Sequence, residues 1–456
     1  MTTPPWQLSA TELAAAYRAG SLKPSEALAS ILDRIAALEP RLNTFAVLDA
    51  EGTSKAAADS DARFAQAKPL GAFDGIPVSI KDNIPVAGLR CAWGSKLYLD
   101  DVPEKDELPV ARLRAQGAVI LGKTNVSEFT LGKGTVHTEA FGTTRNPWNP
   151  ALTTGASSGG AAAAVAAGFG PVALGTDGGG SIRRPAGYQG LAGIKPSTGR
   201  VARVDGLPII LHDFEVIGPL ARTVDDLAMT LAAIEGPDPR DRLSLGFSPG
   251  ALAPLERPLK VLYVPRFGDW TVEEPIAVSC AAAARGLAAM AFTVEEGTAP
   301  FDLSLFETHW PLIGGAGLAW LLRDTDWEGK IGDAYPPLIE RGNTASAAEY
   351  VAALDAARRI YGQLTEAFER YDLIMTPSAG AMPWTAEEPA PAYHRAFTGF
   401  VNAAGLPAIC LPATPSPDGM PIGFQLVGPF AKDWLLLSVG KTFEAAHPWR
   451  DRRPAC

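Results

Sequence analysis

Residues 154–183 read TGASSGGAAAAVAAGFGPVALGTDGGGSIR and hold two clusters of glycine and serine, at 154–160 and at 175–183. Between the clusters, residues 172–175 form a short apolar run that predicts a buried β-strand. Consecutive glycines let backbone N–H groups converge on one point, as a developing oxyanion requires. We therefore expect Gly178, Gly179 and Gly180 to donate to an oxyanion, and the adjacent Ser181 to supply an attacking oxygen.

A glycine-rich segment has two competing interpretations. A phosphate cradle would be followed by Gly-Lys-Ser or Gly-Lys-Thr, which neither cluster is, and no dinucleotide-binding spacing is present. An ordinary tight turn is the usual role of an isolated triple glycine. The second serine cluster nearby favours the catalytic interpretation over the turn.

Outward from this stretch, short apolar runs alternate with segments of helical periodicity, which is typical of an α/β protein. Further strand-like runs cover residues 76–80, 118–122, 260–264, 373–375, 408–411 and 422–427, and helical periodicity covers 224–234 and 347–368. The alternation predicts a large central mixed, mostly parallel β-sheet covered on both faces by helices.

The chain is expected to form a single domain over residues 1–456, because no internal repeat or true linker interrupts this pattern. Ser9 and Glu12 have the spacing of a capping box, and apolar residues recur at helical spacing from Leu28 to Leu38. Residues 1–65, approximately, are therefore expected to be an N-terminal helical segment packed on the domain. Residues 236–345, approximately, are expected to be a variable insert or lid.

A serine nucleophile needs a base, and none of the five histidines (His137, His212, His309, His394 and His447) stands in a catalytic sequence context. The Gly-x-Ser-x-Gly pattern of α/β-hydrolases is also missing around Ser181. Lys81 ends the apolar run 76–80, where burial would lower its pKa and leave it able to accept a proton. A structural role is equally open, because Asp82 and Asn83 follow directly and could pair with Lys81.

Composition narrows the class of protein. The sequence is 47% hydrophobic and 20% charged, as expected of a globular protein, and its net charge of -10 argues against a nucleic-acid-binding surface. Its apolar runs are too short to span a bilayer, and the first eight residues lack the pattern of a secretory signal, which favours the cytoplasm. The cysteines stand singly and are expected to be free thiols: Cys91, Cys280, Cys410 and Cys456.

Several blocks in register resemble the amidase-signature family. They include Lys81-Asp-Asn83, the serine cluster 155–160 and the serine cluster 175–183, with Ser157 and Ser181 separated by the family's 24 positions. The flanking segments 122–125, 127–129 and 145–147 also fit the family, and the C-terminal segments 402–407 and 423–428 resemble its later blocks. The likeness therefore runs from about residue 10 to about residue 447. Ala156 and Ala161 depart from it, standing where glycine and serine are usual.

The resemblance implies roles for individual residues. Ser181 is implied to be the nucleophile, Ser157 a bridging serine on a cis peptide, and Lys81 the ultimate base of a cofactor-independent, metal-free hydrolysis. Ser158, Asp177 and Arg183 are implied to support this core by orienting the relay or holding the glycine loop, although each also fits a purely structural role. Ala156 precedes the expected cis bond, so its methyl group bears on the geometry of that loop.

The family further implies a substrate cavity to which the 236–345 region contributes. Its aromatic residues are Phe306, Trp310, Trp320, Trp327 and Tyr335. An apolar pocket of this kind suits amides, anilides, carbamates (urethanes) or esters as small-molecule substrates. The alternatives are the catalytic A subunit of a glutamine-dependent tRNA amidotransferase and a non-catalytic scaffold that retains the fold. As an amidase, the protein is expected to be a monomer or homodimer without nucleic-acid or membrane partners.

Overall fold

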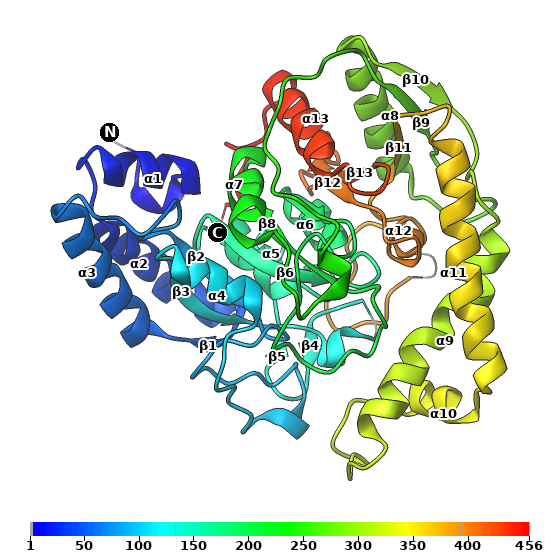
Figure 1. Ribbon diagram of the computed structural model, residues 1–456, viewed down its shortest axis with the longest axis horizontal. Coiled ribbons are helices and arrows are strands. Elements are labelled where there is room, and N and C mark those ends of the chain that lie inside the picture. Colours follow the sequence, from blue (N-terminus) through cyan, green and yellow to red (C-terminus); the bar gives the residue numbers. More distant parts are fainter. Residues whose placement is uncertain (1–2, 133, 392–393, 456) are drawn as a thin grey trace.

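A large twisted sheet forms the centre of the computed structural model, which describes residues 3–132, 134–391 and 394–455 (Figure 1). In the described residues the sheet has eleven strands, in the order β1-β3-β2-β6-β8-β7-β12-β13-β11-β9-β10. Their bounds are β1 Phe45–Leu48, β2 Pro77–Lys81, β3 Val119–Thr124, β6 Val172–Asp177, β7 Ala192–Lys195, β8 Val216–Ala221, β9 Lys260–Tyr263, β10 Thr293–Glu296, β11 Leu373–Pro377, β12 Ala408–Pro412 and β13 Gly423–Val427. The strands β4 (His137–Thr138) and β5 (Gly142–Thr143) pair separately.

The α/β class and the mixed character of the sheet are confirmed, but the sheet is less parallel than predicted. Pairing is parallel along β3-β2-β6 and along β11-β9-β10. It is antiparallel from β6 through β8, β7, β12 and β13 to β11, and between β1 and β3. The reason lies in the connections: β12 and β13 follow one another through a loop without a crossover helix, as antiparallel neighbours can.

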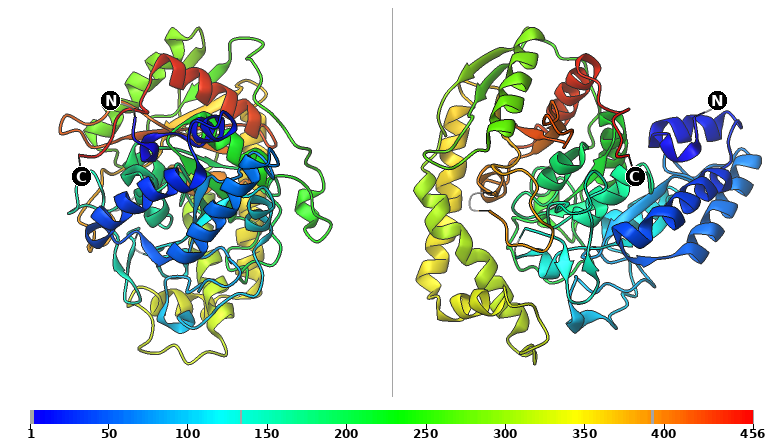
Figure 2. Two further views of the ribbon diagram at one scale, coloured as in Figure 1. Left: turned by 90° about the vertical axis from the view of Figure 1, so that its left-hand side faces the viewer. Right: turned by 180° about the vertical axis from the view of Figure 1, so that it is seen from behind.

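Helices lie against both faces of the sheet (Figure 2). Alternate residues of a strand point to opposite faces, so Val172 and Leu174 pack with the cluster that includes helices α4, α7 and α13, whereas Ala173 packs with α5 and α6. The helices are α1 Ala10–Arg18, α2 Pro24–Leu42, α3 Ala50–Ala65, α4 Leu108–Ala115, α5 Gly159–Ala167, α6 Arg183–Gln189, α7 Val224–Ile234, α8 Glu274–Ala289, α9 Leu303–Leu322, α10 Pro336–Thr344, α11 Ala347–Ala367, α12 Gly399–Ala403 and α13 Asp433–Ala446. The predicted two-faced covering is therefore observed.

The N-terminal helices lie at the β1-β3 end of the molecule but on different faces of the sheet (Figure 1). Helices α2 and α3 pack with Val119 and Leu121 of β3, whereas α1 packs with α7 in the cluster on the other face. The predicted capping box is present, since the Ser9 side chain accepts from Glu12 N and the Glu12 carboxylate accepts from Ser9 N. Within residues 1–65 the strand β1 also joins the main sheet.

The elements α9, α10 and α11 form a layer on the opposite side of the molecule (Figure 1). Strands β9 and β10, which fall between residues 236 and 345, are part of the main sheet. The division of the chain into one domain with a helical segment and an insert stays a prediction.

Two further predictions concern membrane-spanning helices and the state of the cysteines. No helix among the described residues is long and apolar enough to cross a membrane. Cys91, Cys280 and Cys410 are buried free thiols, as predicted, and Cys456 lies outside the described residues.

Candidate active site

The site lies at the carboxyl ends of β2 and β6, which meet there because the two strands are parallel neighbours inside the sheet. Lys81 is the last residue of β2, and Ser181 lies in the short loop between β6 and α6. Ser157 stands just before α5, which contacts both strands. The structure thus brings Lys81 into contact with a serine that lies 76 positions further along the chain.

Lys81 is fully buried, and its Nζ donates to Ser157 Oγ at 2.7 Å and to Thr176 Oγ1 at 2.7 Å. Burial lowers the pKa of Lys81 from its ordinary 10.5 to about 7, although the charges of Glu215 and Asp177 act in the opposite direction. A lysine in this state is neutral in a large fraction of molecules near pH 7, so it can accept a proton from Ser157. Asp82, the structural partner left open by the sequence, instead pairs with Lys123 at 3.7 Å.

Ser157 lies on a cis peptide bond after Ala156, as the resemblance implied. The next residue ties the two serine loops together: Ser158 N donates to Ser181 O at 3.2 Å, and Ser158 Oγ donates to Thr176 O at 3.1 Å. Ser157 and Ser181 both line one cavity, together with Gly178 and Gly179. These contacts place the two serine loops side by side.

Asp177 and Arg183 form a fully buried ion pair that organises the glycine loop. Arg183 Nη2 donates to Asp177 Oδ1 at 2.9 Å and Nε to Oδ2 at 3.0 Å. Burial alone would raise the pKa of Asp177, but the Arg183 charge and hydrogen bonds outweigh it and hold that pKa well below its usual range. Asn402 donates to Asp177 Oδ1 at 3.0 Å, and Gln425 Oε1 accepts from Arg183 at 2.9 Å.

The structure places Gly180 differently from the prediction that it donates to an oxyanion. Its N–H donates to Asp177 Oδ1 at 2.6 Å, so this amide is already used inside the loop. Its φ of 110° lies in the region that favours glycine, and a Cβ there would lie 2.1 Å from Thr398 Oγ1. Gly180 thus shapes the loop, while Gly178 and Gly179 line the cavity.

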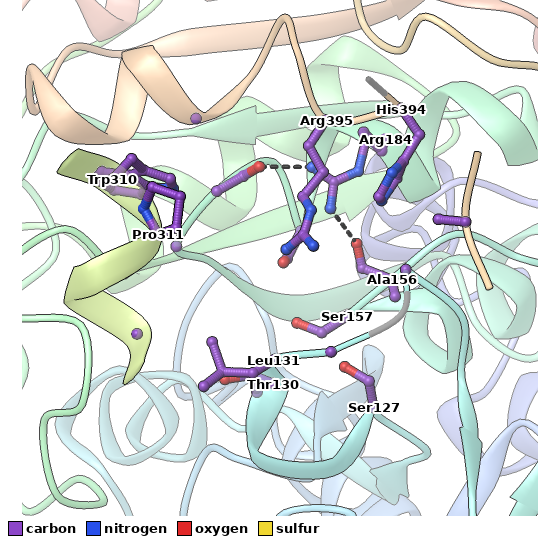
Figure 3. Close-up of a pocket in the computed structure, with 18 of the residues that line it drawn as sticks. Ser127, Thr130, Leu131, Ala156, Ser157, Arg184, Trp310, Pro311, His394 and Arg395 are labelled. Atoms are coloured by element: carbon purple, nitrogen blue, oxygen red, sulfur yellow. Dashed lines mark hydrogen bonds between the residues drawn. The ribbon is translucent and has the colours of Figure 1, made fainter. Parts of the chain in front are cut away.

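The cavity has a volume of about 500 Å³ and two chemically different walls (Figure 3). One wall is apolar and includes Leu131, Leu211, Phe306, Trp310 and Leu338. The other wall carries Arg184, His394 and Arg395 near Ala156 and Ser157, and the Arg184 guanidinium donates directly to Ala156 O (Figure 3).

The aromatic residues named from the sequence divide between cavity and packing. Phe306 and Trp310 line the cavity and stack at a centroid distance of 5.5 Å. Trp320 is 49% exposed, Trp327 packs at the margin of a helical core, and Tyr335 is buried with its hydroxyl donating to Glu128 O at 3.0 Å. Only tertiary structure could separate these roles, because all five are large apolar residues in one region.

Sequence reasoning missed several residues of the site. Thr176 accepts a hydrogen bond from Lys81, His394 lines the cavity despite an uninformative sequence context, and Arg184 and Arg395 supply its positive charge. Asn402 and Gln425 stood within the blocks 402–407 and 423–428, which was the one available signal for them. Among the described residues, no group of three or more His, Cys, Asp or Glu side chains could hold a metal ion.

Comparison with known proteins gives a consistent set of relatives. The family model described as Amidase matches residues 26–437. An acylamidase from Rhodococcus erythropolis is 31% identical over 98% of this chain and 97% of its own length. The A subunit of the glutamyl-tRNA(Gln) amidotransferase from Thermosynechococcus vestitus is 33% identical over 98% of this chain and 96% of its own length.

Solved structures agree with the sequence matches. A bacterial aryl acylamidase of the amidase signature family superposes with a TM-score of 0.89, at 27% identity over 98% of both chains. A 6-aminohexanoate cyclic dimer hydrolase, solved with its substrate, superposes with a TM-score of 0.85, at 28% identity over 99% of both chains.

Proposed function

Because the chain belongs to the amidase family and is a hydrolase of carbon–nitrogen bonds, we propose that it works through an acyl-enzyme on Ser181. In this proposal Ser157 is the proton relay and neutral Lys81 is the general base. Gly178 and Gly179 donate their backbone N–H groups to the oxyanion. Ser158, Asp177 and Arg183 hold the two loops in place.

The proposed reaction has two halves. Lys81 takes the proton of Ser157 as Ser157 takes that of Ser181, and Ser181 Oγ adds to the substrate carbonyl carbon. The tetrahedral intermediate then breaks its carbon–nitrogen bond, and the proton returns through Ser157 to the leaving nitrogen, which departs as a neutral amine. Water adds to the acyl-enzyme by the same relay, and the carboxylic acid leaves as Ser181 regains its proton.

One observation supports this assignment above all others: the fully buried Lys81 donates to Ser157 Oγ at 2.7 Å. A protonated, exposed lysine could not act as a base at neutral pH, whereas burial lowers the pKa of Lys81 to about 7. The proposed base, Lys81, is thus in contact with the proposed relay, Ser157, and its pKa suits proton transfer near pH 7.

We further propose small-molecule amides, anilides, carbamates or esters as substrates of a cytoplasmic monomer or homodimer. The apolar wall with Phe306 and Trp310 supports a substrate with some hydrocarbon or aryl surface. The test is a panel that varies the acyl chain and the leaving group, run on the wild type and on Ser181→Ala. Hydrolysis by the wild type alone, with fluorophosphonate labelling lost in Ser181→Ala, is expected. An unreactive, unlabelled wild type would favour the non-catalytic scaffold.

A second candidate function is that of the catalytic chain in a tRNA-dependent amidotransferase. The observation in its favour is the 33% identity to the amidotransferase chain from Thermosynechococcus vestitus over nearly all of both sequences. Affinity purification from the native host, with mass spectrometry of co-purifying proteins, separates the two candidates. A stoichiometric partner together with glutamine as the preferred substrate would favour the amidotransferase, and hydrolysis of simple amides by the isolated chain favours the amidase.

A further inference from the structure

The cavity beside the paired serines is positively charged, although the chain as a whole carries a net charge of -10. Two arginines, Arg184 and Arg395, line it. None of the described lining residues is an aspartate or a glutamate. Two guanidinium groups that line one cavity repel one another, so the pair is unfavourable until an anion enters.

Arg395 is available to a ligand. It is exposed, and it lines the cavity rather than the outer surface alone. Its guanidinium has no hydrogen bond or ion pair with any described residue, and Figure 3 shows it reaching into the cavity above Ser157.

Arg184 is fixed next to the reacting atoms by neutral acceptors. Its Nη2 donates to Ala156 O at 3.0 Å, and its Nη1 donates to Gly179 O at 2.6 Å and to Thr398 Oγ1 at 2.9 Å. Nη1 also lies 2.5 Å from the position that a Cβ on Gly180 would occupy, immediately before Ser181. Burial and the Arg395 charge lower its pKa to about 9, and the nearby carboxylate of Asp177 is already paired with Arg183.

His394 does not add to the positive charge of the cavity. Burial and the charges of Arg184 and Arg395 lower its pKa to about 2, so the imidazole is neutral at ordinary pH. The positive charge of the wall therefore comes from the two arginines at every pH where the enzyme is expected to work.

We propose that Arg395, with Arg184 beside it, binds a carboxylate group of the substrate, so that the enzyme prefers amides bearing an anionic group close to the scissile bond. This inference rests on the function proposed above and narrows its substrate class. Guanidinium and carboxylate form charge-assisted, often paired hydrogen bonds, which give both affinity and orientation. Arg395 is the specificity residue in this view, and Arg184 positions the loops as well as adding charge.

Matched substrate pairs test the proposal. On the acyl side, succinamic acid is compared with butyramide, and on the amine side, 4-acetamidobenzoate is compared with acetanilide. We expect kcat/KM to favour the anionic member of at least one pair by tenfold or more. Arg395→Gln should reduce that ratio by about tenfold to a hundredfold, the range of a lost hydrogen bond between charged groups, and Arg395→Lys should retain part of it. Arg358→Gln is the matched control, because Arg358 is exposed on α11 and does not line the cavity, and it should leave the ratio unchanged.

The proposal is overturned if the wild type treats both members of each pair alike, or if Arg395→Gln lowers both rates by the same factor. Calorimetric binding to Ser181→Ala separates this result from a failure of the proposed catalytic mechanism. Tighter binding of the anionic member, lost on adding Arg395→Gln, would uphold the anion site even if no substrate were turned over. Equal binding of both members would show that the cavity has no anion site. Circular dichroism of each variant confirms that the fold is retained, and if Arg395→Gln does not fold, the comparison is made with Arg395→Lys.

Discussion

The acidic limb of the pH–rate profile should report the protonation of Lys81. Burial lowers the pKa of this lysine from 10.5 to about 7, which corresponds to about 5 kcal/mol of disfavour for the ammonium form. With that value, about 1% of the molecules hold neutral lysine at pH 5, about half at pH 7 and nearly all at pH 9. Because only the neutral form accepts a proton, kcat/KM should rise about a hundredfold from pH 5 to pH 9 and level off above pH 8.

The assay is the initial rate of release of a chromogenic aniline from an anilide, measured from pH 5 to pH 10 at constant ionic strength. Lys81→Met should abolish the limb together with most of the activity. Lys195→Met is the matched control, because Lys195 is also fully buried and burial also lowers its pKa to about 7. Its Nζ donates to Pro196 O and it does not line the cavity, so the limb should stay in place.

Two results would contradict the role of Lys81 as the base. A flat profile from pH 5 to pH 9 would mean that no group with a pKa near 7 controls the rate. A profile still rising tenfold per pH unit between pH 8 and pH 9 would mean that Lys81 titrates near its ordinary value and is not desolvated.

The remaining predictions concern single groups. Ser181→Ala should lower turnover by at least about a thousandfold and Ser157→Ala by a comparable factor, whereas fluorophosphonate labelling should be lost fully only in Ser181→Ala; equal labelling of both variants would contradict the assigned nucleophile. Asp177→Asn should reduce the free energy of unfolding by about 3–5 kcal/mol, because it leaves Arg183 as an uncompensated buried charge; urea denaturation followed by fluorescence measures this, and a change below about 1 kcal/mol would argue against the ion pair. Incubation with EDTA should leave the rate unchanged, and recovery of a lost rate on adding back a divalent cation would disprove the metal-free mechanism.

Much of the fold could be predicted because its signals are local. The side chains of Ser9 and Glu12 each accept from the other residue's backbone N–H within one helical turn, so their spacing alone predicted the start of α1. The apolar runs that became β2, β3 and β6 are buried throughout and read as strands without reference to any neighbour. Pairing direction was less predictable, because it depends on which strands become neighbours, and β8 inserts between β6 and β7.

Motif spacing and strand periodicity are properties of short segments, so the amino-acid sequence was enough to predict the family likeness and the α/β class. It was also enough to select Lys81, Ser157 and Ser181 as candidates. Three features became visible only in the folded chain: Lys81 is desolvated and contacts Ser157, the Gly180 amide donates to Asp177, and Arg184 and Arg395 share one cavity. Burial, proton affinity and charge complementarity depend on neighbours in space, and those neighbours come from segments as far apart as residues 81, 184 and 395.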